Sequence, residues 1–334
     1  MNKDTDGKRI EYLDTARGIL IILVVLGHTL LFSGGAITEP YSYLMKAIYS
    51  FHMMAFFLIS SFLFNKDKWC ESTIISFCKN RALRLMVPYL FFETIGAVVH
   101  SIFNWGNPES FLMMAKNIFT QQVYVGADWY LPTLFVGELL LYVCCKYLHR
   151  SLNITVAVVG IIAIALGQDH INSQILCIFT RIILCISLLL IGFYVKSFFL
   201  SKKPIWCLLG ACMVWLACSQ LNRLTFLHAP IIGNVFLFLL AGFCGTYFIL
   251  GISERIHAKL LKYLGNNTLP IMGTHQNIEY LISYFWGTST SAIFIIISFL
   301  LMFIPQFAIV PLLNKICPFL IGKPRDNNKA SCKY

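Results

Sequence analysis

Long apolar segments, separated by short polar ones, follow one another along the whole chain. An α-helix needs about 20 mostly apolar residues to cross the hydrocarbon core of a bilayer. The pattern therefore predicts an all-α polytopic membrane protein with about ten transmembrane helices, of which the short fifth is either tilted or re-entrant. The expected spans are residues 15–34, 41–64, 85–104, 128–147, 154–168, 174–195, 205–222, 230–251, 267–286 and 290–316.

The distribution of basic residues predicts how these helices are oriented. If the N-terminus is cytoplasmic, all but four of the 26 lysines and arginines fall in the segments on that side. Such a bias is typical of cytoplasmic loops, so we expect an N-in, C-in topology. The domain organisation follows: a cytoplasmic N-terminal segment (1–14), one transmembrane domain (15–316) and a cytoplasmic tail (317–334). The four exceptions are Lys46, Lys116, Arg181 and Arg223.

Composition excludes several classes of protein. The chain is 58% hydrophobic and 12% charged, whereas soluble domains average about 25% charged residues. The net charge of +11 would suggest nucleic acid in a soluble chain, but the orientation bias accounts for it here, so we expect no nucleic-acid partner. The 12 cysteines show neither CxxC spacing nor a His/Cys ligand pattern, so we expect buried thiols and no metal site.

The first apolar segment contains two residues that point to chemistry. Arg17 and His28 are 11 residues apart, which places them on nearly the same face of a helix and roughly 16 Å apart along its axis. Half of the hydrocarbon core is about 15 Å thick. With Arg17 at the membrane surface, His28 lies near the midplane, where an ionisable side chain is costly and marks a candidate functional site.

Further polar residues interrupt the later spans: His52 and Glu93, Glu138 and Arg181, and the pair His275 and Glu279 on one helix face. Such residues are expected to face a shared interior and not lipid. Histidines and carboxylates at one depth suit general acid–base catalysis. The same set also suits proton-coupled transport or a glycolipid flippase, or simple hydrogen bonding between helices. Composition alone does not separate these interpretations.

A second basic cluster lies on the predicted cytoplasmic side, where Arg81 and Arg84 precede the third span. Loop arginines there commonly set topology, but together with Arg17 they could form a fork for phosphate oxygens. The pantetheine arm of coenzyme A reaches on the order of 15 Å at peptide-like dimensions. A pyrophosphate held by these arginines would therefore bring a thioester near His28.

These motifs, taken together, resemble the integral-membrane acyltransferase-3 family, in the style of its fucose 4-O-acetylase-like branch. The similarity covers nearly the whole chain in order. Two departures are Ser61, where glycine is common, and the absence of the tyrosine often found before His275. The matching segments are Asp14-x-x-Arg17 with His28, Tyr49–Phe64, Arg81-x-x-Arg84 with Pro88-Tyr89, Asp128–Phe135 and Leu264–His275.

The resemblance implies an O-acyltransferase of the inner cell membrane that moves an acyl group, usually acetyl, from cytoplasmic acyl-CoA to a hydroxyl of a cell-surface or lipid-linked sugar. His28 would be the general base or a transient acyl carrier, and Arg17, Arg81 and Arg84 would hold the donor. Asp14 would orient Arg17, and Trp129 could offer a ring face to a sugar. The resemblance leaves supporting roles for His52, Glu138 and His275, and leaves self-association into a homo-oligomer open. The expected partners are thus acetyl-CoA as donor, a carbohydrate or glycolipid acceptor, and the lipid bilayer.

Overall fold

The computed structural model describes residues 11–34, 38–103, 111–121 and 124–323, and this part of the chain is helical with no β-strand. Most of segment 1–14 and of tail 317–334 lies outside the described residues. The helices are α1 (Glu11–Phe32), α2 (Tyr41–Tyr49), α3 (His52–Phe62), α4 (Lys66–Cys70), α5 (Ile74–Arg81), α6 (Val87–Phe103), α7 (Phe111–Phe119), α8 (Tyr130–Tyr147), α9 (Arg150–Gly167), α10 (Gln174–Leu200), α11 (Ile205–Leu221), α12 (Val235–Ser253), α13 (Lys259–Asn266), α14 (Thr268–Trp286), α15 (Ala292–Phe303) and α16 (Gln306–Ile316). Three short elements join them: a π-helical turn η1 (Ala82–Met86) and the 3₁₀ turns η2 (Gln168–His170) and η3 (Pro318–Ile321).

Each of the ten expected spans contains a helix, which confirms the all-α polytopic class. Within the described residues, seven helical stretches are both long and apolar enough to cross a membrane. Two of the others, α8 and α14, have the length but carry polar side chains such as Glu138 and Gln276. The count of ten and the N-in, C-in orientation remain predictions. The seven stretches are Glu11–Phe32, Tyr41–Phe62, Ile74–Phe103, Arg150–His170, Gln174–Leu200, Val235–Ser253 and Ala292–Ile316.

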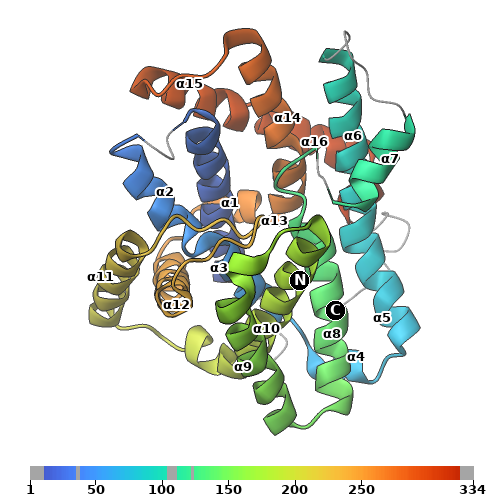
Figure 1. Ribbon diagram of the computed structural model, residues 1–334, viewed down its shortest axis with the longest axis vertical. Coiled ribbons are helices and arrows are strands. Elements are labelled where there is room, and N and C mark those ends of the chain that lie inside the picture. Colours follow the sequence, from blue (N-terminus) through green and yellow to red (C-terminus); the bar gives the residue numbers. More distant parts are fainter. Residues whose placement is uncertain (1–10, 35–37, 104–110, 122–123, 324–334) are drawn as a thin grey trace.

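Several boundaries differ from the sequence-based expectation for physical reasons. The second span is two helices, with a break at Ser50 and Phe51. The third span begins about ten residues before the expected start at residue 85, because α5 continues through the π-helical turn η1 into α6. The last span divides at Pro305, whose ring cannot continue the preceding helix. In Figure 1, α4 and α5 lie at the lower right, towards the α8–α9 connection, while α7 lies at the upper right and the α14–α15 turn at the top.

The first helix is held against the segment that precedes α14. A Cβ on Gly18 would overlap the carbonyl oxygen of Leu261, and one on Gly265 would overlap the carbonyl oxygen of Asp14. Any side chain larger than hydrogen would therefore separate α1 from α13. This close approach places Asp14 and Arg17, on the first turns of α1, directly beside the start of α14.

Candidate functional site

A single cavity of about 1400 Å³ runs through the helical bundle and gathers most of the residues selected from the sequence. Residues from segments predicted on both membrane sides line it, from Asn65–Trp69 at one end to Phe226–Ile231 at the other. Of the nine candidates, Asp14 and His275 do not line the cavity. The seven that do are Arg17, His28, His52, Arg81, Arg84, Trp129 and Glu138.

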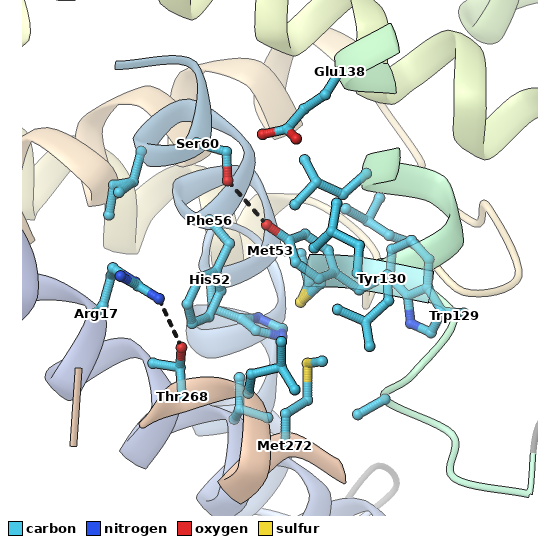
Figure 2. Close-up of a pocket in the computed structure, with 18 of the residues that line it drawn as sticks. Arg17, His52, Met53, Phe56, Ser60, Trp129, Tyr130, Glu138, Thr268 and Met272 are labelled. Atoms are coloured by element: carbon cyan, nitrogen blue, oxygen red, sulfur yellow. Dashed lines mark hydrogen bonds between the residues drawn. The ribbon is translucent and has the colours of Figure 1, made fainter. Parts of the chain in front are cut away.

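Arg17 is oriented by two neighbours. Its Nη2 donates a hydrogen bond to Thr268 Oγ1 at 3.0 Å, and its Nη1 lies 3.9 Å from the carboxylate of Asp14, one turn away on α1. Asp14 is buried while the Arg17 side chain keeps 28% exposure, so the guanidinium reaches the cavity. Figure 2 shows Arg17 bound to Thr268 on one side of His52.

Arg81 and Arg84 have different environments, although the sequence pairs them. Arg81 is largely buried, where its Nε lies 3.1 Å from Glu138 Oε2, and its guanidinium lies 5.2 Å from the ring centres of both Trp69 and Phe77. Arg84 is exposed at the cavity mouth. Glu138 was expected to share a level with the histidines, but it pairs with Arg81, and Figure 2 shows it well apart from His52. We call the end of the cavity that Arg17, Arg81 and Arg84 line the arginine end. Glu138 therefore belongs to the arginine end.

Three histidines lie deeper. The rings of His28 and His275 are 5.2 Å apart, and Tyr49 lies between His28 and His52, with ring centres at 6.4 and 5.1 Å. Ring nitrogen Nδ1 of His52 contacts the carbonyl of Ile48 at 2.8 Å, and Nδ1 of His275 contacts the carbonyl of Met272 at 2.8 Å. His275 is fully buried and supports His28 from behind instead of facing the cavity.

The opposite end of the cavity is lined by the aromatic side chains of Trp129 and Phe226, and we call it the aromatic end. Trp129 lines the cavity with the Arg181 guanidinium 5.6 Å from its ring centre and His228 at 6.4 Å. Burial, with a smaller contribution from the positive charge of Arg181, lowers the pKa of His228, which favours the neutral ring. Glu93 accepts hydrogen bonds from the backbone N–H groups of Tyr124 and Val125, the former at 2.8 Å. Glu93 and Arg181 thus position the segment that carries Trp129.

Sequence reasoning missed Gln276 and Thr268. Gln276 Nε2 lies 2.9 Å from His28 Nδ1, and its Oε1 accepts a hydrogen bond from the backbone N–H of Ala127. A signal was present, because Thr274-His-Gln-Asn277 is a polar run inside an otherwise apolar span. What the sequence could not supply is the partner, since Ala127 lies on another segment.

Comparison with known proteins identifies the family of the chain. A family model described as an acyltransferase domain matches residues 10–310. The chain belongs to the acyltransferase-3 family. This acyltransferase-3 protein is also 44% identical, over 85 residues, to nodulation protein NolL of Sinorhizobium fredii. The aligned region covers 23% of this chain and 22% of NolL. The match therefore spans less than a quarter of the length of NolL. No solved structure matches the chain.

Proposed function

We propose that this multi-pass membrane acyltransferase moves an acyl group, by preference acetyl, from cytoplasmic acyl-CoA to a hydroxyl of a cell-surface or lipid-linked sugar. The observation that carries the proposal is one large cavity, which is lined by arginines at one end and by Trp129 and Phe226 at the other, with His28 and His52 also in its lining. Two chemically different substrates could enter it from opposite sides and meet at the histidines. We propose the inner cell membrane as its location.

The arginine end suits the donor. Coenzyme A carries a pyrophosphate and a further phosphate, which guanidinium groups bind with two parallel hydrogen bonds. Arg17 and Arg84 both reach the cavity, and Arg81 adds positive charge, although its pairing with Glu138 offsets part of it. Lys196 also lines this cavity.

The aromatic end suits a sugar acceptor. Trp129 and Phe226 offer ring faces, and His228 adds a polar group whose lowered pKa keeps it neutral near pH 7. A neutral, partly aromatic lining can hold a carbohydrate through ring-face contacts and hydrogen bonds without requiring charge on the ligand.

The competing function is proton-coupled transport or flipping of a glycolipid. A continuous lining of polar and aromatic residues fits a pathway as well. However, a flippase has no need for three arginines beside a cavity that three histidines, His28, His52 and His228, also line. Consumption of acyl-CoA separates the two functions.

The test uses the purified protein in proteoliposomes with radiolabelled acetyl-CoA and a panel of alkyl glycosides. We expect release of free coenzyme A and label on the glycoside, both lost in His28→Ala, with His257→Ala as control because His257 does not line the cavity. In parallel, mass spectrometry of surface glycans from cells with and without the gene identifies the natural acceptor. Movement of a fluorescent glycolipid across the bilayer without acetyl-CoA consumption would establish the transporter instead.

A further inference from the structure

The orientation of the Gln276 side chain follows from its neighbour Ala127. A backbone N–H can only donate, so the end of the amide that Ala127 contacts must be the oxygen. The other end, 2.9 Å from His28 Nδ1, is therefore the NH₂ group. Glu279 lies one turn further along α14 and also lines the cavity.

The orientation of Gln276 decides which nitrogen of His28 carries the proton. An amide NH₂ has no lone pair to offer, so His28 Nδ1 must accept. A neutral imidazole that accepts at Nδ1 carries its proton on Nε2. In this arrangement His28 can donate a hydrogen bond from Nε2 but has no free lone pair with which to act as a base.

His52 has the opposite arrangement. Its Nδ1 lies 2.8 Å from the carbonyl of Ile48, and a carbonyl can only accept, so Nδ1 carries the proton and Nε2 keeps the lone pair. His275 has the same tautomer through Ile271 and Met272, but its Nε2 is buried and does not reach the cavity. Among these three histidines, His52 alone combines a free lone pair with a place in the cavity lining.

We propose that Gln276 is a positioning residue that gives His28 and His52 complementary roles: His52 removes the proton of the acceptor hydroxyl, and His28 stabilises the oxyanion. This inference rests on the proposed acyl transfer. The hydroxyl oxygen attacks the thioester carbonyl as its proton passes to His52 Nε2, and the negative carbonyl oxygen accepts a hydrogen bond from His28 Nε2–H. The C–S bond then breaks, the ester forms, and the leaving thiolate takes the proton from His52, which restores both histidines.

The decisive variant reverses the polarity of the Gln276 bond. In Gln276→Glu a carboxylate still accepts from Ala127 but must also accept from His28, which forces the His28 proton onto Nδ1. We combine it with Glu279→Gln, so that the pair keeps its net charge, and use the Glu279→Gln single variant as the reference. The combined variant should lose kcat by about 10²–10³-fold, as for removal of one oxyanion donor, with KM for acetyl-CoA unchanged. If His28 were the base, the same change would free its Nε2 lone pair, and an unchanged or increased kcat would overturn the proposal.

A second experiment exchanges the histidines themselves and measures kcat against pH with acetyl-CoA and an alkyl glycoside. Glutamine can donate from nearly the position of His28 Nε2 but cannot titrate, so His28→Gln should keep more activity than His28→Leu. It should also keep the fall in rate at low pH, which arises from protonation of the base. His52→Gln should lose that acidic limb along with most of its rate. An acidic limb lost in His28→Gln and kept in His52→Gln would assign the base to His28.

Nitrogen-15 NMR of histidine-labelled protein in lipid nanodiscs reads the tautomers without any substrate. Signals are assigned by their loss in His28→Gln and His52→Gln. We expect a proton on Nε2 of His28 and on Nδ1 of His52, and transfer of the His28 proton to Nδ1 in the combined variant. A proton on Nδ1 of His28 in the wild-type protein would overturn the inference. The expected tautomers in a protein that does not consume acetyl-CoA would instead overturn the proposed acyl transfer.

Discussion

The two ends of the cavity differ in how their side chains are held. At the arginine end the charges are paired, Arg17 with Asp14 and Arg81 with Glu138. At the aromatic end Trp129 is held by packing, with the Arg181 guanidinium over its ring, and both terminal nitrogens of Arg181 are buried without a hydrogen-bond partner. The difference fits the two ligands of the proposed function: a charged donor that exchanges one set of ion pairs for another, and a neutral acceptor that replaces water at ring faces.

The largest effect is expected at the residue both ligands would share. His28→Ala should lower kcat by about 10²–10³-fold, because it removes the donor to the developing oxyanion, and should leave KM for both substrates unchanged. Rates of acetyl transfer in proteoliposomes, normalised to correctly inserted protein, measure this. Transfer at a near wild-type rate would remove His28 from the reacting centre.

Arg17→Lys should affect the donor only. Lysine keeps the charge but loses the planar fork that can bind phosphate oxygens in pairs, so KM for acetyl-CoA should rise by about 10-fold, which corresponds to roughly 1.4 kcal/mol. KM for the glycoside should not change. Arg150→Lys is the matched control, because Arg150 stacks on Tyr194 away from the cavity. If titration of acetyl-CoA gives the same KM and maximal rate for the Arg17 variant as for the wild type, Arg17 acts only as a topology determinant.

Trp129→Leu should show the converse pattern. Loss of the ring face should raise KM for the glycoside by about 5-fold, in line with an aromatic contact of about 1 kcal/mol, while KM for acetyl-CoA stays constant. Trp206→Leu is the control, since Trp206 is 78% exposed and is not among the residues that line the cavity. A rise in KM for acetyl-CoA in the Trp129 variant would mean that the two ends are not separate sites.

The smallest effect is a salt dependence confined to one substrate. Partly exposed charges such as Arg84 are screened by added salt, so raising ionic strength from about 0.01 to 0.15 M should increase KM for acetyl-CoA by about 2-fold. KM for a neutral glycoside should be insensitive to the same change. Equal responses of both substrates would point to a general effect of salt on the protein.

The helices could be located from the sequence because each apolar segment must match the thickness of the bilayer. Its length and apolar composition are local properties of that segment. Helix periodicity likewise placed Arg17 and His28 on one face, and both line the cavity. The break after Tyr49 and the π-helical turn were not visible, because packing between helices decides them. Gln276 was missed for the same reason: its role depends on Ala127, which lies 149 positions away in the chain.

The π-helical turn at Ala82–Met86 changes what the spacing of the arginine pair means. A π turn holds more residues than an α-helical turn, so Arg81 and Arg84 are turned further apart around the helix axis than two residues three apart on a regular α-helix. One guanidinium is consequently buried on Glu138 while the other stays at the mouth. The number of residues between two basic side chains therefore does not predict the directions in which they point when the helix contains a π turn. A relative with the same Arg-x-x-Arg spacing on an unbroken α-helix would hold its two charges closer to one face.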